Sequence, residues 1–232
     1  MKKILGYFSK GELALWAVST LAVIASFLMF DRENWLTLAA SLVGVTSLIF
    51  AAKGHPAAQA MAIVFAVMYG IISLGFAYYG EMITYMFMSL PMAVFSLISW
   101  LRHPSDSKNE VRVNRLKGRE YLFMAGLAVV VTAVFYFVLK YFNTANLIPS
   151  TISVTTSFVA VYFVFRRSPL YAVGYAANDV VLIVLWTMAS FENVSYIPVA
   201  VCFAAFLAND IYGFINWQRM AKRQAGMQTA AA

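Results

Sequence analysis

The sequence predicts an all-α membrane protein with eight spanning helices, and three observations carry that prediction. Hydrophobic residues make up 62% of the 232 residues, while charged residues make up 12%, and the mean hydropathy is +0.75. This composition is typical of polytopic membrane proteins. The apolar residues fall into eight runs of about 20 residues, the length that a helix needs to cross a bilayer. Lys and Arg are concentrated at one side of the resulting topology.

The eight apolar runs are the expected helices in chain order. They cover approximately 12–30, 34–52, 57–78, 81–101, 121–142, 148–165, 169–190 and 195–217. The first run is too long for a signal-peptide core and lacks a small-residue cleavage site before Asp31, so it is expected to remain as a helix. The fourth run contains Pro91, which removes a backbone hydrogen bond and predicts a kink, either a hinge or a static bend. The single cysteine, Cys202, excludes an intrachain disulfide and a cysteine metal cluster.

The basic residues predict the orientation. Of the 17 Lys and Arg residues, only Arg32 and Lys140 fall on the side opposite the rest. Because basic residues are retained on the cytoplasmic side, both termini are expected in the cytoplasm. The polar segment 102–120 is then a basic cytoplasmic linker that meets anionic lipid headgroups, with partner docking as the alternative. The hydrophobic composition argues against the soluble basic surface that nucleic-acid binding requires.

Two parts of the chain resemble each other. The segment "TLAASLVGVTSLIFAAKGHP" (37–56) aligns without a gap on "STISVTTSFVAVYFVFRRSP" (150–169). Each is a helix rich in small and hydroxyl residues, followed by a basic turn and a proline. Trp100 and Trp217 stand near the ends of the two triplets, where interfacial indoles are expected. Triplets joined by one helix point the same way, as parallel transporter repeats do; a superficial likeness between apolar helices is the alternative.

The expected organisation follows from the spans and the repeat. It consists of an extra amino-terminal helix (1–33), a first three-helix repeat (34–101), a basic linker with a linker helix (102–145), a second three-helix repeat (146–219) and a cytoplasmic tail (220–232).

The seventh span carries the strongest candidate site. On a helix, Tyr171, Tyr175, Asn178, Asp179 and Trp186 fall within a sector of about 100°. A charged residue in mid-span is costly unless it is paired, hydrated or neutralised. The aromatic faces suit a flat, cationic ring, the amide suits a carboxamide or ribose hydroxyl, and the carboxyl suits ribose hydroxyls or a positive ring. The alternatives are helix packing for the tyrosines, and a structural hydrogen bond or proton coupling for Asp179.

Further candidates lie on other spans. The eighth span contributes a polar cluster of Asn209, Asp210, Tyr212 and Asn216, and the first triplet contributes Gln59 and Tyr69, with Ser73, Thr84 and Tyr85 as weaker candidates. Asp210 has the alternative of pairing with Arg219 or with the basic turns. No Gly-rich phosphate loop, metal-binding set or nucleophile constellation is apparent, so neither a primary pump nor an enzyme is predicted.

Several segments resemble the PnuC-type nicotinamide riboside transporters. They are "GEMITYMFMSLPMAVFSLISWLRHP", "EVRVNRL", "NDVVLIVLW" and "NDIYGFINWQRMAKRQ". The resemblance implies a SWEET-like fold of three, one and three helices in the bacterial inner membrane. It also implies facilitated diffusion of nicotinamide riboside by alternating access, without a cofactor, with a cytoplasmic riboside kinase retaining the product. The family pattern aromatic-x-x-aromatic-x-x-x-Asn fits Tyr171 and Asn178 at its ends, but Gly174 takes the middle aromatic position, with Tyr175 beside it.

Other functions stay open at this point. Relatives with this fold are associated with thiamine, riboflavin or deoxynucleosides, and Asp179 leaves proton-driven uptake as an alternative. A ligand-sensing receptor would use the same pocket without passage. A homo-oligomer is also open, because no motif in the sequence fixes the oligomeric state.

Overall fold

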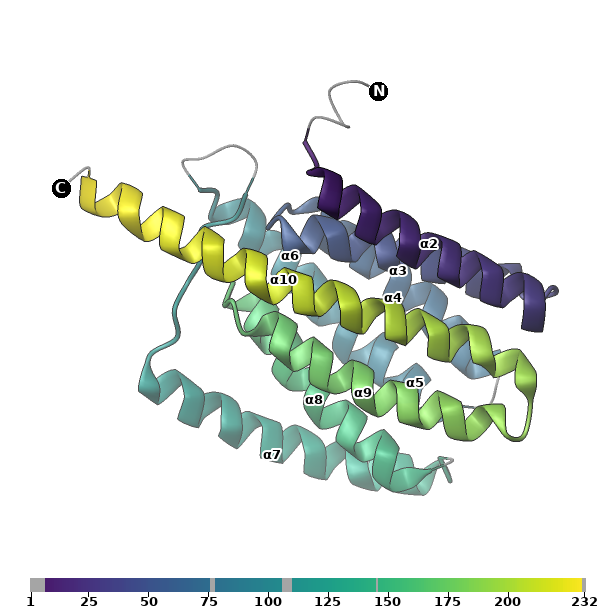
Figure 1. Cartoon of the computed structure of the whole chain (residues 1–232). Helices are drawn as coiled ribbons and strands as arrows, with labels where there is room; N and C mark the ends of the chain where they lie inside the picture. The colour runs from purple at the N-terminus through teal and green to yellow at the C-terminus, as the bar shows by residue number, and fades with distance from the viewer. Residues whose placement is uncertain (1–6, 76–77, 106–109, 145, 231–232) are drawn as a thin grey trace.

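The computed structural model describes residues 7–75, 78–105, 110–144 and 146–230, which are helical over most of their length (Figure 1). The helices are α2 (Lys10–Phe30), α3 (Trp35–Ala52), α4 (Ala57–Gly75), α5 (Tyr79–Thr84), the π-helical turn η1 (Tyr85–Ser89), α6 (Leu90–Arg102), α7 (Gly118–Tyr141), α8 (Leu147–Phe165), α9 (Tyr171–Ser190), the short 3₁₀ turn η2 (Val194–Tyr196) and α10 (Ile197–Ala230). Within the described residues, eight helical segments are long and apolar enough to span a membrane, with α5, η1 and α6 together forming the fourth. The predicted fold class is confirmed.

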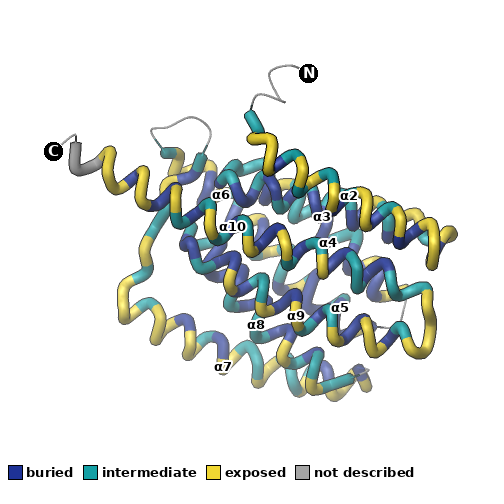
Figure 2. Tube along the Cα trace, in the orientation of Figure 1, coloured by how far each residue is buried: buried dark blue, intermediate teal, exposed yellow. Residues whose placement is uncertain are grey.

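The bundle is built from two three-helix repeats. In the first, α4 packs against α3 and α6, and in the second, α9 packs against α8 and α10. The repeats meet through α3 against α10 and through α6 against α8, so the first helix of each contacts the third helix of the other. α7 joins the repeats and packs against α8, while α2 lies on α3 and α10 (Figure 1). α2 and α7 are the least buried spans, and Figure 2 shows their exposed outer faces.

Two indole groups fasten the repeats together. Trp100 Nε1 donates to the Val164 carbonyl at 2.9 Å, and Trp217 Nε1 donates to the Ala51 carbonyl at 2.7 Å. Ala51 and Val164 occupy equivalent positions in the gap-free alignment of 37–56 with 150–169. The two rings contact each other at a centroid distance of 5.5 Å. Neither tryptophan is exposed to lipid as an interfacial anchor would be, because both are buried and donate to carbonyls in the last turn of a helix of the opposite repeat.

A second pair of hydrogen bonds repeats this symmetry. Ser99 Oγ donates to the Phe165 carbonyl at 3.0 Å, and Asn216 Nδ2 donates to the Ala52 carbonyl at 2.7 Å. Ala52 and Phe165 are again equivalent in the alignment. In each repeat, a residue next to the terminal tryptophan therefore donates a hydrogen bond to a backbone carbonyl in the last turn of a helix. That helix is the first helix of the other repeat. This reciprocity is physical evidence that the internal repeat is genuine.

The basic linker is seated on the two basic turns. Gly54 and Arg167, equivalent in the alignment, both have left-handed backbone conformations, with φ of 66° and 54°. The Val111 amide donates to the Gly54 carbonyl at 2.9 Å, and the Asn114 amide donates to the Arg167 carbonyl at 3.0 Å. The described part of the linker thus binds to both repeats through backbone hydrogen bonds. We call this end of the bundle, formed by the turns 53–56 and 166–169 and by the linker 110–117, the basic end.

The last helix runs well past the expected boundary between repeat and tail. α10 continues without a break to Ala230. Gln224 is buried, and it accepts from the Val113 amide at 2.8 Å and donates to the Val111 carbonyl at 3.1 Å. The division expected at 219/220 therefore does not correspond to a structural break. The sequence predicts a tail here because the last apolar run ends near 217, but contact of Gln224 with the linker holds this segment as helix.

The fourth span changes geometry beside Pro91. Residues Tyr85–Ser89 form a π-helical turn, and Pro91 stands in the first turn of the α-helix that follows. The predicted interruption is therefore present, at the π-turn that precedes the proline. Proline lacks the amide that a regular helix would use, and π-turns inside helices are frequent at functional sites.

A buried carboxylate anchors the extra helix α2 to both repeats. Glu12 Oε1 accepts from the Tyr212 hydroxyl of α10 at 2.7 Å, and Glu12 Oε2 pairs with Lys53 Nζ at 3.2 Å. Glu12 also closes a capping box with Ser9 at the start of α2. Because Lys53 follows α3 and Tyr212 belongs to α10, one side chain joins α2 to the first and second repeats at the basic end.

Glu12→Ala is expected to destabilise the protein by about 1.5–3 kcal/mol, the range for hydrogen bonds to charged groups. Removing the carboxylate also leaves the half-buried Lys53 ammonium without its partner. The change is measured as a lower melting temperature of the purified protein in detergent. Glu33→Ala is the control, since Glu33 is exposed and its side chain makes no hydrogen bond to a described residue. Equal melting temperatures for the two variants would contradict this role of Glu12.

Candidate binding site

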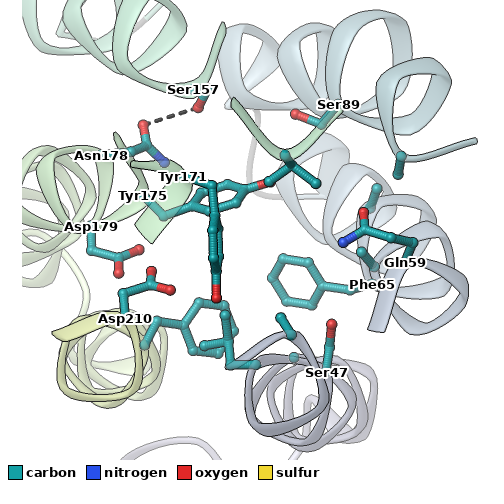
Figure 3. A pocket seen from close by; sticks show the side chains of 18 of the residues that line it. Ser47, Gln59, Phe65, Ser89, Ser157, Tyr171, Tyr175, Asn178, Asp179 and Asp210 are labelled. Carbon is teal, nitrogen blue, oxygen red and sulfur yellow. Dashed lines mark hydrogen bonds between the residues drawn. The ribbon is translucent and has the colours of Figure 1, made fainter. Parts of the chain in front are cut away.

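A cavity of about 100 Å³ lies between the two repeats (Figure 3). Its walls come from α3, α4, η1 and α6 of the first repeat and from α8, α9 and α10 of the second. The residues along it that carry polar groups or rings are Ser47, Gln59, Phe65, Tyr85, Ser89, Ser157, Tyr171, Tyr175, Asn178, Asp179, Phe203, Phe206 and Asp210. Ligand pockets usually measure about 300–1,000 Å³. A nucleoside-sized ligand would therefore require the lining side chains to move apart.

Asn178 is held by hydroxyl groups of α8. Its Oδ1 accepts from Ser157 and Thr156 at 2.9 Å each, and from Ser153 at 3.4 Å. With Oδ1 saturated, the amide nitrogen is left for the cavity, toward which it lies in Figure 3. The hydroxyl-rich pattern of the sixth span thus fixes the orientation of one amide on the seventh. Asn178 presents two N–H donors to a ligand.

Two carboxyl groups meet at the boundary of α9 and α10. Asp179 and Asp210 are each 2% exposed, and their carboxyl groups face each other beside the cavity (Figure 3). Asp179 Oδ2 has no hydrogen-bond partner among the described residues. The expected alternative, pairing of Asp210 with Arg219, is wrong, because its position on α10 turns Asp210 toward α9. The pair therefore belongs to the cavity wall.

The first repeat supplies a wall of mostly small and apolar side chains, with Phe65 and Tyr85 as its aromatic rings. Phe65 of α4 lies in the cavity, and extending the alignment past the paired prolines places it at the position equivalent to Asn178. Gln59 is 6% exposed, its amide points into the cavity, and it makes no side-chain hydrogen bond to a described residue (Figure 3). Equivalent positions of the two repeats therefore carry unlike side chains at the cavity, with the Phe65 ring in the first repeat and the Asn178 amide in the second.

The predicted site residues divide into two groups. Five of them, Gln59, Tyr175, Asn178, Asp179 and Asp210, line the cavity together with Tyr171 and the weaker candidate Tyr85. The sequence reasoning missed Phe65, Phe203, Phe206 and Ser157. The chain has 19 phenylalanines, and nothing in their local sequence separates those at the cavity from those facing lipid. The repeat alignment was the one signal that would have paired Phe65 with Asn178.

Trp186 and Tyr69 lie beyond the cavity in an aromatic layer. Trp186 Nε1 donates to the Tyr69 hydroxyl at 2.6 Å, and both side chains are buried. The Trp186 ring also contacts Tyr78 and Tyr196, at centroid distances of 4.8 and 5.7 Å. Tyr69 in turn stacks on Phe65 at 5.5 Å. The layer therefore closes the cavity on the side away from the basic end, and its tryptophan does not line the cavity.

Asn209 and Tyr212 face the extra helix rather than the cavity. Asn209 Nδ2 donates to Ser19 Oγ of α2 at 2.9 Å, and Tyr212 donates to Glu12 as described above. Successive residues on a helix point about 100° apart, so Asp210 and Asn209 cannot share one face. The apparent polar cluster on the eighth span serves two different interfaces.

Gly174 allows α9 to approach α8 closely. A Cβ atom at this position would lie 2.8 Å from Ala160 Cα and 3.1 Å from its backbone nitrogen. No aromatic side chain fits there, which accounts for the departure from the aromatic-x-x-aromatic-x-x-x-Asn pattern. Tyr175, the next residue, reaches the cavity instead.

Two parallel three-helix repeats that enclose a polar and aromatic cavity within their spans define a membrane transporter. A family profile described as nicotinamide mononucleotide transporter matches residues 34–219. The chain belongs to this family. The match covers both repeats and the linker, and α2 precedes it.

Named relatives and a solved structure agree with this family. The nicotinamide riboside transporter PnuC of Neisseria mucosa is 26% identical over 219 residues, covering 92% of this chain and 83% of the relative. The protein of the same name from Haemophilus influenzae is 20% identical over 194 residues, covering 82% of each. The structure titled "Crystal structure of the Vitamin B3 transporter PnuC" superposes with a TM-score of 0.82 at 23% identity, over 94% of both chains. The resemblance drawn from the sequence is confirmed, and the relatives are transporters and not enzymes.

Proposed function

We propose that this protein takes up nicotinamide riboside across the bacterial cytoplasmic membrane, by facilitated diffusion with alternating access. The observation that carries the proposal is the chemistry of the cavity wall. Aromatic faces, two amides and a carboxyl pair surround one space, and none of the described residues lining it is Lys, Arg or His. Such a wall suits an aromatic ring with a carboxamide and sugar hydroxyls, and it offers nothing to a phosphate.

The wall provides a partner for each part of the riboside. Tyr175 and Phe65 offer faces on which a planar ring can stack. The free amide nitrogen of Asn178 suits a carbonyl acceptor, such as the oxygen of a carboxamide. Gln59, which lacks a protein partner, both donates and accepts, as a ribose hydroxyl requires.

The same wall favours the riboside over its phosphorylated form, the mononucleotide. A phosphate group carries up to two negative charges, and burying it without cationic partners is costly. Next to the carboxyl pair of Asp179 and Asp210 the cost rises further through like-charge repulsion. We therefore assign to this chain the substrate in the names of its relatives, and not the mononucleotide of the family description.

Passage through the protein requires the cavity to open at alternate ends. The Trp186–Tyr69 layer lies on one side of it, and the Trp100–Trp217 contact lies toward the basic end. The reciprocal bonds between repeats supply a symmetric seam about which they can rock. With the basic end in the cytoplasm, opening there releases the riboside to a cytoplasmic kinase, whose phosphorylation keeps the inward gradient.

Uptake of labelled nicotinamide riboside by proteoliposomes tests the proposal. We expect the internal concentration to rise to that outside and no further, with no uptake of the mononucleotide. Empty liposomes are the control for leakage. Uptake of the mononucleotide at a comparable rate, or no uptake of the riboside, would refute the substrate assignment.

Proton-driven uptake is the second candidate, and the buried carboxyl pair is the observation that favours it. The same vesicles with an inward proton gradient separate the two mechanisms. Accumulation above the external concentration only when the gradient is present would establish coupling and exclude facilitated diffusion. Competition by unlabelled thiamine and riboflavin in this assay tests whether another vitamin is the cargo.

A further inference from the structure

We propose that the Asp179–Asp210 pair makes this site selective for substrates whose ring is positively charged, so that the reduced, neutral form of the riboside is discriminated against. The inference rests on the proposed function and names the charge of the substrate at the same site. The oxidised riboside is an N-glycosyl pyridinium cation. Its dihydropyridine form has nearly the same size and the same carboxamide and hydroxyl groups, but no ring charge.

The pair is built into the cavity wall. Both residues line the cavity, one from α9 and one from α10, and each is 98% buried. Asp179 Oδ2 has no protein partner among the described residues. The neutral Gln59 amide, also unpartnered and 94% buried, points into the same space from α4 (Figure 3). Polar groups left unsatisfied around one cavity indicate that a ligand completes them.

Among the described residues, the protein places no positive charge in the cavity wall next to the carboxyl pair, so a cation at this position has to come from the ligand. No described residue lining the cavity is basic, so no protein cation stands in the wall beside the two carboxyls. Two facing carboxyl groups in a dry site repel each other when both are ionised. A buried negative charge with no positive charge beside it also has a large free-energy cost. A bound pyridinium ring offsets that cost, and a neutral dihydropyridine ring does not.

The aromatic residues act in the same direction. Tyr171 and Tyr175 lie beside the carboxyl pair (Figure 3), and Phe65, Phe203 and Phe206 also line the cavity. The faces of such rings carry partial negative charge and attract cations, most strongly when water is excluded. An aromatic enclosure with carboxyl groups on one side is a general solution for binding organic cations.

Calorimetric titration of the purified full-length protein tests the proposal. Nicotinamide riboside chloride and its reduced form are titrated in parallel into the wild-type protein and into the Asp179→Asn and Asp210→Asn variants. We expect the wild type to bind the cation at least tenfold more tightly. Each substitution should weaken cation binding by at least tenfold and change binding of the reduced form by less than threefold. Asp31→Asn is the control, because Asp31 is a buried carboxyl at the end of α2 that does not line the cavity.

The outcomes separate the two proposals. Equal binding of both forms by the wild type overturns charge selectivity and leaves the proposed function standing, and this comparison needs no variant to fold. Full cation affinity in both Asn variants overturns the role of the pair. If the wild type binds neither form, the proposed function falls and the selectivity with it. Melting curves identify a variant that fails to fold, and Asp179→Glu, which keeps the charge, then replaces it and should preserve the preference for the cation.

Discussion

Gly174→Ala is expected to lower the melting temperature and weaken riboside binding at least tenfold. The new methyl group would lie 2.8 Å from the backbone Cα atom of Ala160, which cannot rotate away, so α8 and α9 must separate. Overpacking of this kind costs about 1–3 kcal/mol, more than the gain of up to ~1 kcal/mol from replacing glycine in a helix. Asn178 lies one turn further along the same face of α9, so the separation also breaks its bonds to Ser157 and Thr156.

Gly126→Ala is the matched control for that result. Gly126 is also within a spanning helix, but apart from its own turns of helix no atom of a described residue lies within 4 Å of the position its Cβ would take. Its replacement should leave the melting temperature unchanged or raise it slightly. Thermal unfolding in detergent and calorimetric titration with nicotinamide riboside measure both effects. Unchanged stability and affinity in Gly174→Ala would show that the close contact between α8 and α9 is not required.

Asn178→Ala is expected to weaken riboside binding by at least tenfold, which corresponds to about 1.4 kcal/mol. The substitution removes the amide nitrogen that faces the cavity and frees the hydroxyls that hold the amide in place. Asn178→Asp is more specific, because a carboxylate still accepts from Ser157 and Thr156 but has no N–H to donate. Both variants should lose affinity if the donor contacts the ligand.

Asn209→Ala provides the comparison for this asparagine. Asn209 is equally buried within a span, but its amide bonds to Ser19 of α2. Its replacement should lower stability modestly and leave the binding affinity within threefold of wild type. Calorimetric titration of the three variants with nicotinamide riboside measures the difference in binding affinity. Wild-type affinity in folded Asn178→Asp would show that Oδ1, and not the nitrogen, is the group that matters.

Several features of the fold were predictable because they depend on local sequence alone. The eight spans follow from runs of apolar residues that a bilayer requires, and the repeat follows from the paired basic turns and prolines. The seventh-span positions Tyr175, Asn178 and Asp179 were found because a polar group in a spanning helix is costly and therefore conspicuous. Trp186 shares their sector but lies about two turns further along α9. Its side chain therefore belongs to the aromatic layer beside the cavity and does not line the cavity.

Other assignments failed because they depend on what packs against a residue. Trp100 and Trp217 have the sequence context of interface anchors, yet each reaches a helix end in the opposite repeat. The polar side chains of Asn209 and Tyr212 form hydrogen bonds with α2, and the residues of the eighth span alone do not reveal this partner. Phe65 carries no polar signal at all, and it enters the cavity because its helix is placed opposite α9.

Composition, periodicity and turn residues are enough to predict an eight-span membrane protein made of two parallel repeats. They do not predict that Asp179 meets Asp210 instead of a basic partner, or that Phe65 and Asn178 line the same cavity, which follows from the packing of the repeats. The physical reason is that a span is specified by its own residues, whereas a site between repeats is specified by contacts across them. Those contacts depend on how two similar helix triplets are rotated against each other, which hydrophobicity alone does not encode.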